Sequence, residues 1–275
     1  TMRFPYGIAD FAAIMEEGYF YVDRTDRIPL IENAGKQLLF LRPRRFGKSL
    51  WLSTLENYYD LARADDFQRL FGGLKIGQNP TPRHNRYFIL KLNFSMVAPR
   101  GDAEAVAASL HRHVNNAIEA FAVHYREALN TPIDCHPTDS LWSLGRLLTA
   151  ISTTPHKLYV LVDEYDNFAN EVMISPLRGT NRYEELVQGE GTIKTLFKAI
   201  KAGAEGRGID RVFLTGVSPV VLSDMTSGYN VAEDLSPRPW LHDLCGFTET
   251  ELRAALEAVV AAHGLDTAQV DTALN

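Results

Sequence analysis

Residues 37–50 read QLLFLRPRRFGKSL, and the class of fold can be inferred from the order of elements that they indicate. Its apolar beginning, Gln37–Arg42, has the length and composition of a buried β-strand. Pro43 breaks that pattern, a Gly-Lys-Ser triplet follows, and Ser49–Asp60 then has the pattern of a helix. A strand, a basic loop that contains glycine, and a helix, in that order, form the layout of a phosphate-binding loop.

The loop can be compared with the general pattern GxxxxGK(S/T). In that pattern backbone N–H groups surround the phosphates, the lysine reaches the β- and γ-phosphates, and the hydroxyl group binds Mg²⁺. Lys48 and Ser49 match the last two positions, whereas Arg42 stands where the pattern begins with glycine. The departure has a small effect, because phosphate is bound by the N–H groups that lead into Lys48 and by the helix N-terminus. We predict that the nucleotide contacts Pro43, Arg44, Arg45, Phe46, Gly47, Lys48, Ser49 and Leu50.

A pair of acids follows a second apolar segment. Lys157–Asp163 reads KLYVLVD, as strands buried on both faces do, and Glu164 comes next. In ATPases with a phosphate-binding loop, the first acid of such a pair serves the Mg²⁺ site and the second polarises the attacking water. Neighbouring residues on a strand point to opposite sides, so the two acids can serve two targets. We predict that Asp163 and Ser49 bind the metal and that Glu164 is the catalytic base. Taken alone, the pair would more simply be a strand that reaches solvent.

A further apolar segment, Arg211–Gly216, reads RVFLTG and ends in polar residues. In ATPases of this kind, a polar side chain at the tip of the strand beside the acidic one contacts the γ-phosphate or the attacking water. We predict this role for Thr215, which completes a catalytic set with Lys48 and Glu164, and Ser218 is a second candidate. An ordinary strand end with an ST-turn explains each residue equally well. The sequence has no (N/T)KxD motif for reading guanine, so adenine is the favoured base.

Strand-like and helical segments alternate along the chain. The expected strands are 37–42, 87–93, 157–163 and 211–216, and the later expected helices are 102–129, 140–152 and 192–204. Residues 72–86 are expected to form a loop, and the polar residues 170–191 an irregular excursion. Such alternation is typical of an α/β protein. The predicted fold is an α/β P-loop NTPase with a central, mainly parallel sheet flanked by helices, plus a small helical C-terminal part.

We divide the chain into an N-terminal extension, a P-loop core and the start of a helical C-terminal segment, at residues 1–36, 37–235 and 236–275. The extension alternates aromatic and polar residues and is expected to form a short hairpin and a helix. Thr248 and Glu251 have the spacing of a capping box that opens a helix, and Gly264 closes that helix. We expect the chain to stop inside a further helix, as the front portion of a longer protein would.

Composition limits the class of protein. The 275 residues carry 28 Lys and Arg against 34 Asp and Glu, a net charge of −6, which disfavours a surface that is basic all over. Hydrophobic residues make up 45% of the chain, so disorder is excluded, and no apolar run has the length of a membrane span. Two distant cysteines, Cys135 and Cys245, favour a reducing cytoplasm.

Within the phosphate loop, Arg42, Arg44 and Arg45 form a basic cluster with Lys48. We expect at least one arginine to contact phosphate, with a solvated loop as the alternative.

Six segments together resemble the bacterial AAA-ATPase-like family, whose members commonly carry a C-terminal PD-(D/E)XK-type nuclease domain. The matching segments are Phe4–Ile8, Tyr21–Thr25, Arg42–Leu50, Val162–Asp166, Leu214–Pro219 and Gly246–Glu249. The Arg-Pro-Arg-Arg-Phe-Gly-Lys-Ser form is characteristic of this family, so Arg42 is a shared feature. The resemblance implies an ASCE-type, AAA-like core with ATP and Mg²⁺ as ligands. It implies the same roles for Lys48, Ser49, Asp163 and Glu164, and a nuclease-like domain after residue 275.

The leading hypothesis is therefore a cytoplasmic, Mg²⁺-dependent ATPase that acts as the regulatory or motor module of a longer protein and controls a C-terminal nuclease. The alternative is a switch module that binds ATP or ADP with negligible hydrolysis. A small-molecule kinase would need an acceptor pocket for which the sequence has no feature. Nucleic-acid binding through the arginine cluster and assembly into a homo-oligomer both remain open, and no membrane partner is expected.

Overall fold

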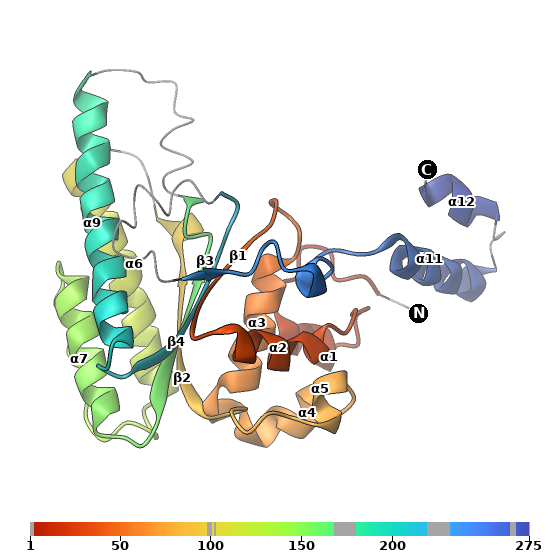
Figure 1. Ribbon diagram of the computed structural model, residues 1–275, viewed down its shortest axis with the longest axis horizontal. Coiled ribbons are helices and arrows are strands. Elements are labelled where there is room, and N and C mark those ends of the chain that lie inside the picture. The colour runs from red at the N-terminus through yellow and green to blue at the C-terminus, as the bar shows by residue number, and fades with distance from the viewer. Residues whose placement is uncertain are drawn as a thin grey trace.

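The computed structural model describes residues 3–97, 101, 103–167, 180–218, 232–264 and 268–274. Its centre is a five-stranded sheet in the order β2-β3-β4-β1-β5, in which every neighbouring pair is parallel (Figure 1). The strands are β1 (Gln37–Leu41), β2 (Tyr87–Asn93), β3 (Lys157–Asp163), β4 (Ile209–Gly216) and β5 (Glu233–Asp234). The predicted α/β fold with a central parallel sheet is confirmed.

The strand order brings the carboxyl ends of β1, β3 and β4 to one edge of the sheet. β4 lies between the other two, and its Thr215 is opposite Phe40 of β1. Asp163, the last residue of β3, is opposite Asn93 of β2. In open parallel sheets, ligands bind outside the carboxyl ends of the strands. The loop predicted to bind phosphate and the predicted acids leave the sheet at this edge.

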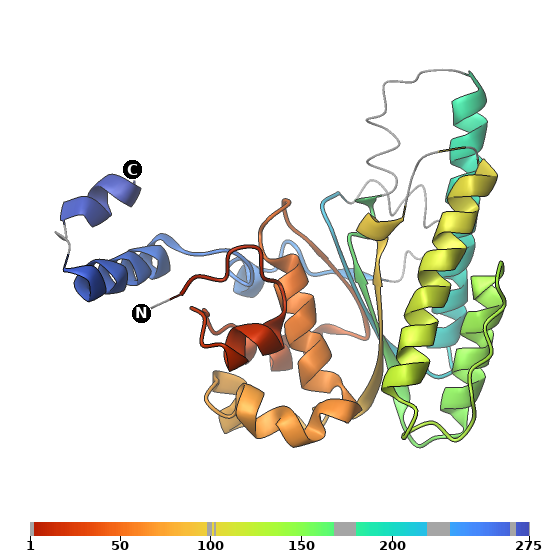
Figure 2. The same cartoon turned by 180° about the vertical axis from the view of Figure 1, so that it is seen from behind.

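Helices cover both faces of the sheet (Figures 1 and 2). One face carries the three long helices α6 (Ala103–His124), α7 (Ser140–Ser152) and α9 (Thr180–Ala204). The other carries α1 (Phe11–Glu16), α2 (Ile28–Ala34), α3 (Lys48–Tyr59), α4 (Phe67–Phe71) and α5 (Lys75–Gln78). Side chains of β3 alternate between the two cores, with Val160 and Val162 in one and Tyr159 and Leu161 in the other. Burial on both faces explains why the strands are apolar nearly throughout.

Short 3₁₀-helices connect several of these elements. They are η1 (Thr25–Arg27), η2 (Leu61–Asp66), η3 (Phe94–Met96) and η4 (Pro239–Leu241). The bounds predicted from the sequence for β2, β3 and α7 agree with the structure. In the ranges that the structure describes, none of the helices has the length and apolar character needed to cross a bilayer.

Several predicted elements differ from the structure. Helix α9 begins at Thr180, whereas residues 180–191 were expected to be irregular, because the polar stretch TNRYEELVQGEG shows no apolar stripe of helical period. Helix α6 ends at His124 instead of continuing to residue 129. The loop predicted for 72–86 contains α5. The rest of the predicted excursion, residues 170–179, lies outside the described residues.

The alternating aromatic residues near the N-terminus predicted a hairpin, and this prediction is wrong. The structure has α1 and α2 there, and Arg3 makes a single parallel bridge with Tyr19. The aromatic residues pack on other elements instead. Phe11 stacks on Phe71 with ring centroids 4.8 Å apart, so burial against α4 explains its apolar character. Alternation alone could not distinguish this packing from a strand.

The N-terminal segment holds the residues that lead into the last two helices. The Arg24 guanidinium, whose side chain is 10% exposed, forms a two-pronged ion pair with the Glu251 carboxylate, and its Nε donates to the backbone oxygen of Asp243. Arg27 donates to both carboxylate oxygens of Asp243, at 3.0 and 3.1 Å, and to the backbone oxygen of Trp240 at 3.1 Å. Residues 240–251 are therefore fixed to the N-terminal segment by charged hydrogen bonds.

The C-terminal helices α11 (Glu249–His263) and α12 (Ala268–Leu274) stand away from the sheet (Figure 1). The predicted capping box is present, because Thr248 N donates to Glu251 at 2.8 Å and Glu251 N donates to the Thr248 hydroxyl at 3.3 Å. Gly264 ends α11 in a left-handed conformation, as predicted. Glu251 thus both caps α11 and pairs with Arg24, so one side chain sets how the helix leaves the core.

Replacing Glu251 with Gln tests this connection. Gln can keep the capping-box bond but not the charge, so Glu251→Gln should lower the free energy of unfolding by about 1.5–3 kcal/mol at neutral pH. Urea denaturation followed by circular dichroism measures the change. The matched control is Glu249→Gln in the same helical turn, whose side chain is 80% exposed and which should change stability by less than about 0.5 kcal/mol. Equal stability of the two variants would contradict the assignment.

The same pair predicts a pH dependence. The hydrogen bonds from Arg24 lower the pKa of Glu251 from 4.5 to about 2. A carboxyl group with a lowered pKa stabilises the folded state fully above its unfolded pKa, and the contribution disappears as the pH falls through the folded pKa. The stability difference between the wild type and Glu251→Gln should therefore shrink between pH 4.5 and 2.

Candidate functional site

The loop between β1 and α3 has an unusual backbone. Gly47, the residue before α3, has φ +84°, a left-handed conformation that glycine adopts without strain. Arg45 has φ +65°, which is uncommon for a residue with a side chain and costs on the order of 1 kcal/mol or more. No side chain caps the N-terminus of α3. The first N–H groups of this helix therefore point into the loop, where an anion can accept from them.

Lys48 lies inside this loop. Its side chain is buried, and Nζ donates to the backbone oxygens of Arg42 and Pro43, each at 2.8 Å. Burial lowers the pKa of Lys48, while the nearby carboxylate of Asp163 acts in the opposite direction. The lysine thus folds back on its own loop and holds it closed. Contact with an incoming phosphate requires Nζ to exchange these carbonyl oxygens for phosphate oxygens.

Asp163 brings three elements together. Its Oδ2 accepts a hydrogen bond from the Ser49 hydroxyl at 2.5 Å, and its Oδ1 accepts one from the Thr215 hydroxyl at 2.7 Å. Asp163 is 2% exposed and Thr215 is fully buried. The two hydroxyl groups come from the start of α3 and the end of β4. Residues distant in sequence that were predicted to share a metal site and a catalytic set therefore lie in contact.

Glu164 follows β3 in a different geometry from the one predicted. Its φ of +52° places it in a left-handed turn, so its direction is set by that turn and not by the alternation of a strand that already ends at Asp163. Burial raises the pKa of Glu164, the charge of Asp163 raises it further, and the cations Arg44 and Lys48 act in the opposite direction. A half-buried carboxylate between two cations and an acid is a suitable position for a proton acceptor.

Asp166 and Asn167, which follow Glu164 in the chain, were not predicted as part of the site. Asp166 is 1% exposed and accepts from the backbone N–H groups of Val217 and Ser218, at 2.8 and 2.7 Å. It joins the turn after β3 to the turn after β4. The predicted candidate Ser218 is therefore held here through its backbone. The only sign in the sequence that Asp166 belongs to the site was its place at the end of the acidic segment Val162–Asp166.

The second of these residues is Asn167. Its Oδ1 accepts from Nη2 of Arg44 at 3.3 Å. Arg44 of the phosphate loop thus reaches across to the turn that carries Glu164. An asparagine in a polar turn is too common for its sequence to indicate such a contact.

Arg42, at the position where the general pattern has glycine, points away from the loop. Its guanidinium donates to the backbone oxygens of Ser236 and Leu241, at 3.1 and 3.2 Å, and lies 4.4 Å from the ring centroid of Phe40. The Ser236 hydroxyl also accepts from Leu41 N at 2.8 Å. Of the basic cluster, Arg42 therefore binds the C-terminal segment, whereas Arg44 and Arg45 stay exposed beside the loop.

The C-terminal segment also approaches the loop at Phe46. A Cβ atom added to Gly246, whose φ is +85°, would lie 3.4 Å from the ring of Phe46. Cys245 is buried, which raises its pKa to about 12, and the positive charge of Lys48 acts against that shift. The phosphate loop, the N-terminal segment and the start of α11 are thus linked through residues 236–251.

The donor set fits a Mg²⁺ ion that is bound together with phosphate. Mg²⁺ in such sites takes one or two protein oxygens and completes its shell with phosphate and water. Ser49 and Asp163 supply one hydroxyl and one carboxylate that already converge. Among the described residues, no three His, Cys, Asp or Glu side chains come together as a metal cage.

Comparison with known proteins gives the following matches. The family described as predicted AAA-ATPase matches residues 5–226. An uncharacterized protein from the vnfD 5′ region of Azotobacter chroococcum is 29% identical over 257 residues, which is 92% of this chain and 44% of that protein. The chain therefore spans less than half the length of this relative. No solved structure matches.

The close contact between the end of β4 and the turn after β3 can be tested by its effect on stability. A Cβ atom at Gly216 would lie 2.6 Å from Cδ1 of the Tyr165 ring and 2.7 Å from Oδ1 of Asp166, so neither neighbour leaves room for it. Gly216→Ala should lower the free energy of unfolding by about 1–3 kcal/mol. The matched control is Gly145→Ala in α7, where a Cβ would meet nothing within 4 Å and alanine should stabilise the helix by about 0.5–1 kcal/mol. Urea denaturation compares them, and a Gly216→Ala variant as stable as the wild type would contradict the close contact.

Proposed function

The chain belongs to the predicted AAA-ATPase family, and from this premise we propose that it binds ATP with Mg²⁺ and hydrolyses it. The observation that carries the proposal is the contact of Asp163 with both Ser49 and Thr215 beside the loop of Lys48. A nucleotide-binding P-loop and a second strand with an acid at its carboxyl end are the two parts that such an ATPase needs. Both parts meet at the edge where open parallel sheets bind ligands.

In this proposal the phosphates lie against the loop. The backbone N–H groups of residues 44–50, which include the N-terminus of α3, donate to them. Lys48 would exchange its two carbonyl partners for phosphate oxygens, and the hydroxyl of Ser49 and the carboxylate of Asp163 would hold Mg²⁺. The ion supplies positive charge that polarises the phosphate. The exposed Arg44 and Arg45 add positive charge beside the same loop.

Glu164 is the proposed general base. It orients a water molecule and accepts its proton as the water oxygen bonds to the γ-phosphorus and the bond from phosphorus to the bridging oxygen of ADP breaks. Burial raises the pKa of Glu164 above its usual value, which makes the carboxylate a stronger base. Thr215 would act as a positioning residue, since its hydroxyl donates to Oδ1 of Asp163 and so fixes the orientation of that carboxylate.

We further propose that the binding and hydrolysis of ATP at the loop change the position of α11 and of the part of the protein that α11 connects to. Movement of Lys48 away from the backbone oxygens of Arg42 and Pro43 would change the loop that also holds residues 236–241 through Arg42. Those residues continue into the segment that Arg24 and Arg27 fix before α11. A regulatory or motor module of a longer protein needs such a connection, and a C-terminal nuclease-like domain is the partner proposed for it.

The alternative function is a switch that binds ATP or ADP with negligible turnover. Its support is the closed state of the loop, in which Lys48 and both carboxylate oxygens of Asp163 already have partners. A phosphate-release assay on the purified chain distinguishes the two functions, because only the ATPase produces phosphate over many turnovers.

Nucleotide binding is tested at Lys48. Lys48→Ala should abolish ATP binding in a calorimetric titration, because the ammonium group is the one cation that the loop buries next to Asp163. The control is Lys36→Ala, which removes an exposed lysine that pairs with Asp210 and should leave the affinity unchanged. Thermal unfolding of both variants establishes that they are folded. Unchanged ATP affinity in folded Lys48→Ala would reject the site.

Hydrolysis is tested at Glu164. Glu164→Gln keeps the size of the side chain but not its basicity, so ATP should still bind while phosphate release falls by about 100-fold or more. In the wild type, turnover should fall as the pH drops through the raised pKa of Glu164, since protonation removes the base. Glu205→Gln, an exposed acid after α9, is the control and should turn over normally. Normal turnover of Glu164→Gln would exclude this residue as the base.

A further inference from the structure

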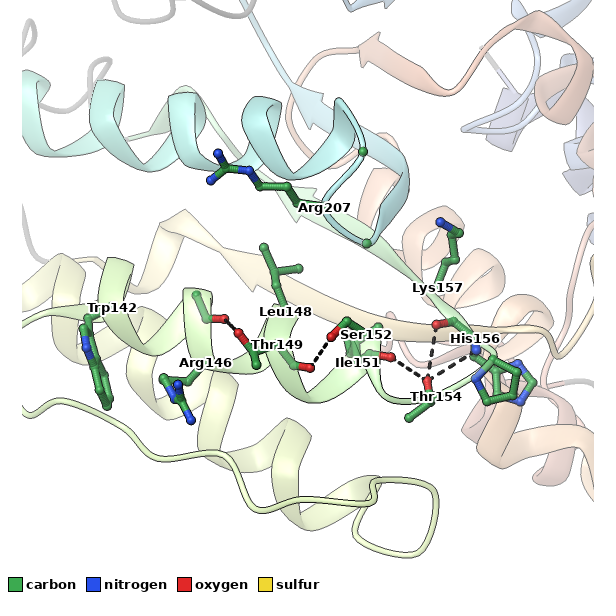
Figure 3. Close-up of a pocket in the computed structure, with 14 residues that line it drawn as sticks. Trp142, Arg146, Leu148, Thr149, Ile151, Ser152, Thr154, His156, Lys157 and Arg207 are labelled. Atoms are coloured by element: carbon green, nitrogen blue, oxygen red, sulfur yellow. Dashed lines mark hydrogen bonds between the residues drawn. The ribbon is translucent and has the colours of Figure 1, made fainter.

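A cavity of about 760 Å³ lies at the opposite edge of the sheet from the candidate site. Its walls come from α7, from the residues that begin β3, and from the turn between α9 and β4 (Figure 3). Lys157 of the lining is the first residue of β3 and Asp163 is the last, which separates the cavity from the metal-site acid by about 20 Å. The cavity is therefore distinct from the proposed ATP site.

Positive charge gathers around this cavity. Arg146, Lys157 and Arg207 line it, each exposed and each from a different wall, and His156 adds an imidazole. None of the lining residues is an Asp or Glu. Within the described part of the chain, the ion pairs do not include any of the three cations. In a chain whose net charge is −6, three uncompensated cations around one hollow form a local anion-attracting surface.

The cavity also presents an aromatic ring. Trp142 is 46% exposed, although tryptophan usually buries most of its surface. The Arg146 guanidinium lies 5.7 Å from the Trp142 ring centroid, and Figure 3 shows both side chains on the same side of α7. An exposed indole ring beside an arginine is a flat surface on which a nucleobase can stack.

The backbone around the hollow leaves room for a ligand. Gly206 and Gly208, with φ of +129° and +107°, make the tight turn that carries Arg207, and a Cβ at Gly145 or Gly206 would meet nothing within 4 Å. Figure 3 shows Arg207 beside α9, and Trp142 and Arg146 extending from α7 on the side away from Arg207. A ligand in the cavity would thus have cations on different walls and a stacking ring on one of them.

We infer that this cavity binds a segment of single-stranded nucleic acid, with backbone phosphates at Arg146, Lys157 and Arg207 and a base stacked on Trp142. Cations along a groove together with an exposed aromatic ring are the combination that binds single strands without base-specific hydrogen bonds. A concave hollow of this volume admits a base and its phosphate but not a double helix. The inference is independent of ATP hydrolysis, because the cavity shares no residue with the proposed ATP site.

The test uses the whole chain and a fluorescein-labelled oligothymidine of about 15 nucleotides, with fluorescence anisotropy measured over a range of salt concentrations without ATP. The triple variant Arg146→Ala, Lys157→Ala, Arg207→Ala should bind at least tenfold more weakly at low salt. The slope of log affinity against log salt should also fall by about 2, since three phosphate contacts are lost. Trp142→Ala should weaken binding by about tenfold while leaving the salt slope unchanged.

The matched control removes the same charge from the other face of the sheet. Arg63→Ala, Arg69→Ala, Lys75→Ala takes the half-buried Arg63 of η2 and the exposed Arg69 and Lys75 from α4 and α5, and should bind the oligonucleotide as the wild type does. Thermal unfolding confirms that each variant is folded. Failure of the wild type to bind at low salt overturns the inference, as does equal weakening in the two triple variants. Displacement by inorganic tripolyphosphate with no effect of Trp142→Ala also overturns it, because the site would then hold phosphate without a nucleobase.

Discussion

The candidate site depends on the two hydrogen bonds that the carboxylate of Asp163 accepts. Each of its oxygens accepts one hydroxyl hydrogen bond, from Ser49 at the start of α3 and from Thr215 at the end of β4. These contacts require β4 to lie between β1 and β3, so the strand order and the site are one arrangement. A buried carboxylate is unstable without such partners, which ties the acid to the fold around it.

A second set of contacts joins the phosphate loop to both ends of the described chain. Arg42 holds residues 236–241, while Arg24 holds Glu251 and the backbone of Asp243. The N-terminal segment, the loop and the start of α11 therefore share one connected network of charged hydrogen bonds. This network is the basis of the proposal that a ligand at the loop acts on α11, because moving one member would leave buried charges without their partners.

The sequence predicted the central elements well and the peripheral ones poorly. β2, β3 and α7 were predicted to the residue because buried strands are apolar throughout and α7 has a clear apolar stripe. The first half of α9 was missed, since its polar residues carry no periodic signal. Glu164 was predicted from strand alternation, whereas its positive φ shows that a turn sets its direction. Asp166 was overlooked because its role depends on backbone N–H groups of a distant turn.

The class of fold could be predicted from the sequence, which also identified the loop before α3 and the acids at the end of β3 as the candidate site, because periodicity and short motifs are local properties of a chain. Only the tertiary structure decided which groups meet. It placed Arg42 against the C-terminal segment and not in the loop, and it closed Lys48 onto carbonyl oxygens of its own loop. It also gathered Arg146, Lys157 and Arg207 around one cavity. Contacts between residues far apart in sequence follow from strand order and packing, which no local pattern encodes.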